Sequence, residues 1–304
     1  MSFLDTLQQM IVILFAMVLG YTAQKKGVLN QAANGVLSKL LLNITAPALI
    51  LGSAMVGETL PEFSELLSIL KVAVFFYGLE FLIAFAAAPL IGGTPKQKGV
   101  WRFALSCSNM GFIGFPVVMK LFGPDKLIYA AILMLPFNVI SYSFGPLMLA
   151  GAKNFSWKQF ISPSVLASFG ALFISLFRIR LPDLVGECVN FIGDITVPLS
   201  LVLVGSLLAA VPVGKVFTNP RLWLITASRL LIQPALIWLI LRHMPGVSPV
   251  VLGIAVIEMG MPVAANGSML SIEHGGDTET VAQITFLTTL LSILTIPLVA
   301  AVFL

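Results

Sequence analysis

The sequence predicts an all-α membrane protein with ten transmembrane helices, arranged as two inverted repeats of five helices. Three observations support this: the chain is very apolar, its apolar residues form long runs, and short motifs recur in the same order in both halves. Of the 304 residues, 58% are hydrophobic and 10% are charged, and the mean hydropathy is +1.02. Because a soluble domain has roughly 25% charged residues, we expect a lipid bilayer around this chain.

Charge and cysteine usage exclude other classes. The 17 Lys or Arg and 13 Asp or Glu residues give a net charge of +4, but the positive residues are scattered through short loops, so a nucleic-acid partner is not expected. Cys107 and Cys188 have no metal-ligand spacing and form no disulfide framework. We expect no metal and no cofactor. The first residues include Asp5 and no Lys or Arg, so the first apolar run is expected to be retained as a helix.

Ten apolar runs are long enough to cross a bilayer, which takes about 20 helical residues. They lie near residues 6–24, 36–56, 67–91, 101–121, 127–150, 160–178, 187–211, 221–242, 248–271 and 280–303. This division gives a first repeat at 1–150, a short connection at 151–159, and a second repeat at 160–304.

The distribution of basic residues predicts the orientation, since cytoplasmic loops carry an excess of Lys and Arg. The connections after the first, third, fifth and seventh segments hold ten basic residues, against six in those after the second, fourth, sixth and eighth. The ten are Lys25, Lys26, Lys39, Lys96, Lys98, Arg102, Lys153, Lys158, Lys215 and Arg221. The 151–159 connection is therefore expected in the cytoplasm and both termini outside it, in the inner or plasma membrane.

The repeat is visible as three motif pairs in the same order. Because five helices are an odd number, the second repeat must enter the membrane from the opposite side, which gives an inverted repeat. The pairs are Asn43-Ile44-Thr45-Ala46-Pro47 with Asp194-Ile195-Thr196-Val197-Pro198, Gly114-Phe115-Pro116 with Gly260-Met261-Pro262, and Gly145-Pro146-Leu147 with Ile296-Pro297-Leu298.

The fourth and ninth segments are predicted to be broken helices, each interrupted near its proline, Pro116 or Pro262. Each segment has glycines and a proline near its middle, and these residues let the backbone leave helical geometry. In a membrane, non-helical backbone survives only where it is buried in protein or lines a cavity. Two such breaks at matching places indicate a substrate site, where half-helix N-termini offer N–H groups to an anion.

Amides near these breaks suit a carboxylate ligand, because an Asn side chain offers two donors and an acceptor. Asn109 and Asn266 could equally cap a half-helix, and one residue could do both. The candidate substrate-binding residues are Asn43, Asn109, Gly111, Gly114, Pro116, Asn138, Pro262, Asn266 and Thr289. Asn43 is included with its repeat counterpart Asp194, and Asn138 with its counterpart Thr289.

Three ionisable residues, Glu80, Arg229 and Glu258, are expected within the membrane, where a charge is costly and therefore marks a candidate functional residue. Glu80 and Arg229 occupy corresponding helices of the two repeats and are expected to form a structural ion pair. Glu258 has no evident partner, and burial favours the neutral form of a carboxyl, so it is a candidate to carry a coupling proton. Asp194 is a second candidate for ion coupling, although it could also be a solvated charge at a helix entrance.

The chain resembles bacterial members of the auxin efflux carrier family over essentially its whole length. The resemblance lies in Leu41-Leu42-Asn43-Ile44-Thr45-Ala46-Pro47, in Ser108-Asn109-Met110-Gly111-Phe112-Ile113-Gly114-Phe115-Pro116, in Thr196-Val197-Pro198-Leu199 followed by Gly205, and in a stretch from Met261-Pro262-Val263-Ala264-Ala265-Asn266 through Glu273-His274-Gly275-Gly276-Asp277 to Leu298.

The resemblance implies ten helices that cross at the prolines of helices 4 and 9, and a transport domain that moves against a scaffold domain. It also implies a small organic anion as substrate, auxin in plants and malate or malonate in some bacterial members. The long cytoplasmic loop of the plant carriers is absent, because only residues 151–159 connect the halves here. Glu258 matches no family motif that we identify.

The predicted function is secondary transport of a small organic anion by alternating access, linked to the proton-motive force. The alternative is a sodium-coupled symporter resembling the bile acid carriers. A channel is disfavoured by the paired breaks. A membrane-embedded enzyme is also disfavoured, since His243 and His274 lie near loops and no His-Glu-x-x-His motif occurs. Besides the substrate, the coupling ion and the lipid, a second copy of the chain is a partner that the sequence leaves open.

Overall fold

A computed structural model describes residues 3–55, 63–150, 163–177, 179, 181–209, 211 and 216–304, and these residues form an all-helical protein. In the first half the helices are α1 (Phe3–Lys25), α2 (Gln31–Leu40), α3 (Ala46–Ser53), α4 (Phe63–Ile91), α5 (Pro95–Ser106), α6 (Phe115–Phe122), α7 (Leu127–Val139) and α8 (Gly145–Ala150). In the second half they are α9 (Pro163–Phe177), α10 (Asp183–Gly193), α11 (Thr196–Ala209), α12 (Pro220–Ala227), α13 (Gln233–Leu241), α14 (Pro249–Met259), α15 (Asn266–His274) and α16 (Thr278–Phe303).

Within the described residues, five helical stretches are long and apolar enough to cross a membrane: Gln31–Gly52, Phe63–Ile91, Asp183–Ala209, Pro220–Leu241 and Thr278–Phe303. At 1.5 Å per residue, the 29 residues of α4 extend about 43 Å. This exceeds the roughly 30 Å of a bilayer's hydrocarbon core. The predicted 151–159 connection lies outside the described residues.

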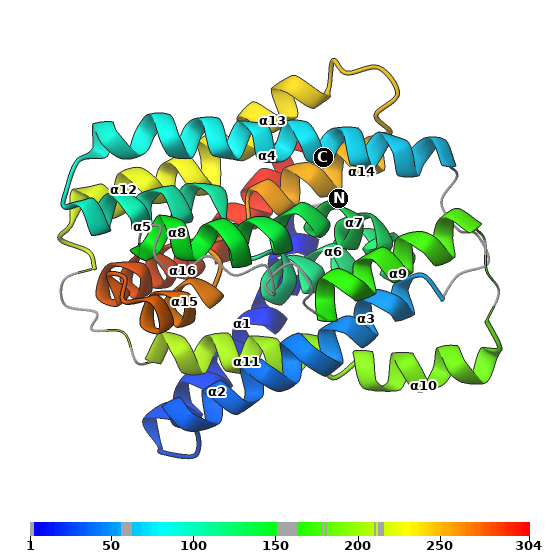
Figure 1. The fold of residues 1–304 in the computed structure, drawn as a ribbon, viewed down its shortest axis with the longest axis horizontal. Coiled ribbons are helices and arrows are strands. Elements are labelled where there is room, and N and C mark those ends of the chain that lie inside the picture. The colour runs from blue at the N-terminus through cyan, green and yellow to red at the C-terminus, as the bar shows by residue number, and fades with distance from the viewer. Residues whose placement is uncertain are drawn as a thin grey trace.

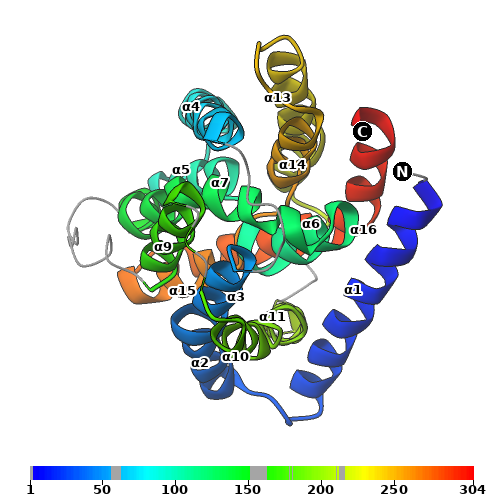
Figure 2. The ribbon, with the colours of Figure 1, turned by 90° about the vertical axis from the view of Figure 1, so that its right-hand side faces the viewer.

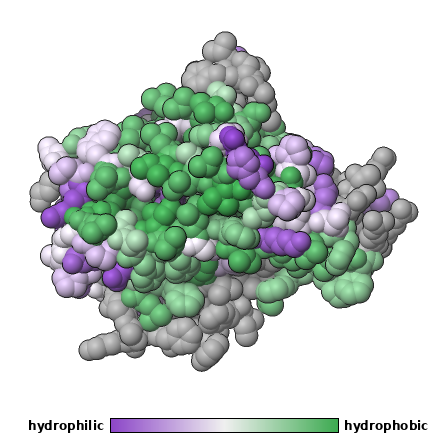
Figure 3. All heavy atoms as spheres, turned by 90° about the horizontal axis from the view of Figure 1, so that it is seen from above, coloured by the Kyte–Doolittle hydropathy of each residue, from purple (hydrophilic) through white to green (hydrophobic). Residues whose placement is uncertain are grey.

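Most helices run along one common direction, so that Figure 2 looks nearly down the axes of α4, α10 and α11, whereas α1 crosses them obliquely. Figure 1 shows α4 across the top of this bundle and α2, α10 and α11 along its bottom. On the face seen in Figure 3, a broad apolar region separates hydrophilic residues at the two ends. An apolar band between polar ends is the surface that a bilayer requires.

In the part of the chain that the structure describes, four short π-helical turns interrupt the helices, and each ends two residues before a proline. They are η1 (Leu41–Thr45) before Pro47, η2 (Met110–Gly114) before Pro116, η4 (Ile140–Phe144) before Pro146, and η8 (Ser228–Ile232) before Pro234. Proline lacks an N–H group and its ring clashes with the carbonyl four residues earlier. Widening the preceding turn relieves this clash without ending the helix.

Two interruptions of the helices are complete. The first separates α5 from η2 at residues 107–109, where Cys107 is extended (φ −126°, ψ 98°), and the second separates α14 from α15 at residues 260–265. The sequence Ser106-Cys107-Ser108-Asn109 consists of residues whose side chains compete with helical hydrogen bonds. In the second interruption, Pro262 prevents the helix from continuing.

The position of the first interruption differs from the prediction. Pro116 was expected at the crossing, but it lies inside α6, beyond the break at residues 107–109. The π turn η2 accommodates this proline, so the helix continues through it. In the second segment the break does contain Pro262.

Helices α1 and α11 pack backbone against backbone through two reciprocal glycines. A Cβ atom at Gly20 would collide with the carbonyl of Val202, and one at Gly205 would collide with the carbonyl of Met17. Small residues allow such close approach of helices in a membrane. The Ser200 hydroxyl, on the same helix α11, donates to the carbonyl of Phe112 at 3.1 Å and joins α11 to the π turn η2.

Candidate functional site

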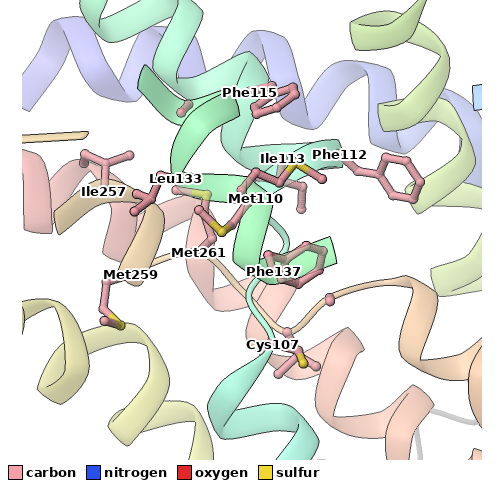
Figure 4. Packing of buried hydrophobic residues seen from close by; sticks show 14 of the residues in the cluster. Cys107, Met110, Phe112, Ile113, Phe115, Leu133, Phe137, Ile257, Met259 and Met261 are labelled. Carbon is pink, nitrogen blue, oxygen red and sulfur yellow. The ribbon is translucent and has the colours of Figure 1, made fainter. Parts of the chain in front are cut away.

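The two interrupted segments meet and pair as a short antiparallel bridge between Ser108 and Val263. The Asn109 N–H donates to the Pro262 carbonyl at 2.7 Å, and the Ala264 N–H donates to the Cys107 carbonyl at 3.0 Å. Figure 4 shows apolar side chains of both segments, including Met110 and Met261, gathered around this crossing. Mutual pairing therefore satisfies backbone groups that would be costly to leave open in hydrocarbon.

A small pocket lies beside the crossing. Its cavity volume is about 30 Å³. It is lined by Leu42, Asn109, Gly111, Phe112, Met134, Phe137, Ala264, Ala265 and Asn266. A single water needs about 10–15 Å³ of such space. A larger ligand therefore has to displace the flexible side chains of the lining.

Asn109 and Asn266 are the polar side chains of this pocket. The side-chain Oδ1 of Asn109 caps the π turn η2 by accepting from the Phe112 N–H at 3.3 Å. The buried Nδ2 of the same side chain has no hydrogen-bond partner in the described part of the chain. Capping and a free donor thus coexist in one side chain.

The Asn266 side-chain amide contacts the π turn η4, which lies between α7 and α8. Its Nδ2 donates to the Ser141 hydroxyl at 3.0 Å, and its Oδ1 has no partner among the described residues. Because a hydroxyl both donates and accepts, Ser141 satisfies either orientation of the amide. Asn266 can therefore present a donor or an acceptor to a ligand.

The other predicted site residues lie at different distances from the pocket. Gly111 lines it, and Pro262 joins the crossing through its carbonyl. Asn43 and Asp194 are exposed and do not line the pocket, and the Asn43 amide donates to the Lys39 carbonyl on its own helix. The Thr289 hydroxyl is buried on α16 outside the lining, and the side chain of Asn138 falls outside the described part of the structure.

Glu258, in the last turn of α14, is fully buried, and neither carboxyl oxygen has a partner in the part of the chain that the structure describes. Its carboxyl occupies the space that a side chain at Gly114 would fill. Gly114 belongs to the π turn η2, two residues after the pocket residue Phe112. A carboxyl without a partner thus lies against the element that forms one wall of the pocket.

Glu80 and Arg229 form the predicted ion pair, with 2.7 Å between Nη1 and Oε1, and both side chains are fully buried. Burying two charges is tolerable in hydrocarbon only when they pair and find further hydrogen bonds. Arg229 projects from the π turn η8 and Glu80 from the middle of α4, so the pair joins two long helices at the depth of the crossing.

Besides the apolar residues of the lining, two polar residues next to the site were not among the candidates. Ser141 holds Asn266, and Gln233 donates from its Nε2 to the Leu105 carbonyl at 3.0 Å, at the end of α5. Both lie close to a proline that follows a π turn, Pro146 and Pro234. The proline positions could have indicated them. Among the described residues, no group of three His, Cys, Asp or Glu side chains is placed to hold a metal ion.

Comparison with known proteins assigns the chain to a family. The model of the membrane transport protein family matches residues 5–156 and 145–300. The chain belongs to this family. The resemblance to the auxin efflux carriers is thereby confirmed.

Three relatives align with nearly all of the chain. An "uncharacterized transporter" of Methanothermobacter thermautotrophicus is 24% identical, and the alignment covers 98% of each chain. A second "uncharacterized transporter", from Methanocaldococcus jannaschii, is 22% identical over 95% of this chain and 96% of its own. A protein of Rhizobium meliloti named "putative malonate transporter" is 21% identical over 87% of this chain and 85% of its own.

Proposed function

We propose that this membrane transporter is a secondary carrier of a small organic carboxylate, built from ten spanning helices in two inverted repeats. The observation that carries the proposal is the crossing of two interrupted helical segments beside a pocket with two buried amides. Interrupted helices at equivalent places of two repeats form the substrate sites of many secondary transporters. The matched motifs in both halves and the odd helix number per half support the inverted arrangement.

The chemistry of the pocket favours an anion. Helices begin at Met110 and Asn266, next to the pocket, and the first N–H groups of a helix lack internal partners and carry a partial positive charge. Asn109 adds an unpartnered amide donor. The small volume and the relative named for malonate transport favour a short dicarboxylate such as malonate or malate as the substrate.

Glu258 is our candidate for the coupling site. It is buried against η2, so a change in its charge acts directly on a wall of the pocket. A lone carboxylate is strongly disfavoured in hydrocarbon, so the carboxyl would carry a proton when it is enclosed and release it when water reaches it. Asp194 remains a second candidate from its sequence position, although it is exposed.

The test is uptake of labelled malonate by purified protein in liposomes. We expect accumulation that depends on an imposed pH gradient and that unlabelled malate inhibits. Accumulation driven only by a sodium gradient would favour the alternative symporter type. Absence of uptake for malonate, malate and indole acetate alike, in vesicles that contain folded protein, would refute the proposed substrate class.

A further inference from the structure

Arg229 makes an unusual set of contacts for a buried cation. Its Nε donates to the Met261 carbonyl at 3.1 Å, and its Nη1 donates to the Leu105 carbonyl at 3.0 Å. The same Nη1 contacts Glu80 at 2.7 Å and the Gln233 side-chain carbonyl at 2.8 Å. One guanidinium thus joins its own helix, which also carries Gln233, to three other parts of the chain.

The two backbone carbonyls belong to the two interrupted segments. Leu105 lies in the last turn of α5, directly before the first break, and Met261 lies within the second break. The last carbonyls of a helix have no partner within it, and they carry the partial negative charge of the helix end. Arg229 therefore binds an acceptor from each broken segment, and Gln233 binds one of the two acceptors a second time.

Arginine is suited to this position in a way that lysine is not. Its planar group carries five donors in fixed directions, whereas an ammonium is a compact point charge. The π turn before Pro234 places Arg229, and Glu80 on α4 compensates its charge. Lysine at this position could keep the ion pair but would lose the geometry that reaches both carbonyls.

Hydrogen-bond acceptors and donors of the two broken segments are separated at the crossing. The acceptor ends of the broken segments are turned to an internal cation, whereas the donor ends, at the starts of η2 and α15, lie next to the pocket. We propose that Arg229 is a positioning residue for the substrate site, which holds the carbonyl ends of both segments and so leaves donor groups for an anion. This inference rests on the proposed transport of a carboxylate.

Cys107 provides a natural reporter for the crossing. It is buried within the first break, and its carbonyl accepts from Ala264, whereas the second cysteine, Cys188, is exposed. In a Cys188→Ser background, the rate at which N-ethylmaleimide labels Cys107 measures how often the crossing opens. Mass spectrometry of the protein in liposomes gives this rate without any substrate.

Arg229→Lys should raise the labelling rate of Cys107 about tenfold or more, because loss of a hydrogen bond to a charged group makes opening of the crossing more frequent by about this factor. The matched control is Arg242→Lys, because Arg242 lies exposed at the end of α13, over the Trp238 ring and beside His243, and contacts neither break in the described structure. The control should label at the original rate. An unchanged rate in Arg229→Lys would overturn the proposal.

Two further measurements separate positioning from simple loss of structure. If Arg229→Lys aggregates on purification, Gln233→Leu is measured instead, since it keeps the ion pair and removes a donor to the Leu105 carbonyl. Faster labelling of Cys107 in this variant supports the proposal that these side chains hold the carbonyl ends, and an unchanged rate refutes it. For each folded variant, the dissociation constant of malonate should rise about tenfold while the thermal midpoint stays near that of the original protein. Faster labelling with unchanged malonate affinity refutes the role in the substrate site. A starting protein that binds no malonate refutes the proposed substrate but leaves the labelling test valid.

Discussion

At the scale of single residues, the site depends on polar groups that are buried with part of their hydrogen-bonding capacity unused. The Nδ2 of Asn109, the Oδ1 of Asn266 and both carboxyl oxygens of Glu258 have no partners among the described residues. Buried polar groups are normally satisfied, and exceptions call for an explanation. A bound carboxylate would accept from the Asn109 Nδ2, and from Asn266 when its amide is turned so that Oδ1 accepts from Ser141 and Nδ2 faces the pocket. A carried proton would account for Glu258.

Asn109→Ala and Asn266→Ala should each weaken substrate binding by about ten- to a hundredfold, because a hydrogen bond to a charged group contributes roughly 1.5–3 kcal/mol. The measurement is the dissociation constant of malonate for purified protein. Asn43→Ala is the control, since Asn43 is exposed and outside the pocket, and it should bind normally. Unchanged affinity in both pocket variants would exclude the proposed site.

Glu258→Gln should preserve malonate binding and remove the pH dependence of uptake, because glutamine has nearly the same shape but cannot exchange a proton. Uptake is measured in liposomes at several external pH values with a fixed substrate gradient. Asp194→Asn serves as the comparison at the other candidate position. A pH profile that is unchanged in Glu258→Gln would remove this residue from the coupling mechanism.

At the scale of helices, prolines and glycines determine where the elements bend, break and touch. Pro47, Pro116, Pro146 and Pro234 each widen the preceding turn, whereas the crossing itself forms at residues 107–109 and 260–265. The breaks are stable because the segments pair with each other and with Arg229.

Gly20→Ala should destabilise the packing of α1 on α11, because the added methyl group would collide with the Val202 carbonyl. Overpacking of this kind costs about 1–3 kcal/mol. Thermal unfolding in detergent should show a lower midpoint. Gly78→Ala in α4 is the matched control, since an added Cβ there meets nothing within 4 Å. Equal midpoints for the two variants would contradict the close contact.

Arg229→Ala should reduce the amount of folded protein in the membrane, because Glu80 would then be buried without its partner. Removing one member of a buried pair costs about 3–5 kcal/mol. Size-exclusion chromatography of the extracted protein measures the folded fraction. A normal folded fraction with loss of transport alone would contradict this prediction and show that Arg229 matters for the substrate site and not for the stability of the fold.

At the scale of the whole molecule, the two halves of the chain pack together around a common core, and one face shows a broad apolar region (Figure 3). Helix α1 of the first half packs on α11 of the second, and the crossing joins α5 and η2 to α14 and α15. Neither half therefore completes the site alone. Movement of one group of helices against the other could open the pocket to either side in turn.

Both termini should lie outside the cytoplasm, as the distribution of basic residues predicts. Single cysteines introduced at positions 2 and 154, in a background without the two natural cysteines, are labelled in intact cells with an impermeant reagent. Position 2 should react and position 154 should not. The opposite pattern would reverse the orientation of the protein while leaving its fold unaffected.

The sequence by itself determined the membrane class, the presence of an interruption in the fourth and ninth segments and the pairing of Glu80 with Arg229, whereas the ten spanning helices and the substrate roles of Asn109 and Asn266 stay predictions. These follow from hydrophobic runs, Gly-Pro positions and the rarity of charges in hydrocarbon, which are local or compositional properties. Only the tertiary structure decided that the first break precedes Pro116, that Asn43 and Asp194 are exposed, and that Ser141 and Gln233 belong to the site. The physical reason is that a freed backbone group is stabilised by whichever partner lies nearest in space. The pairing of Cys107 with Ala264, and of Arg229 with Leu105 and Met261, joins residues far apart in the chain.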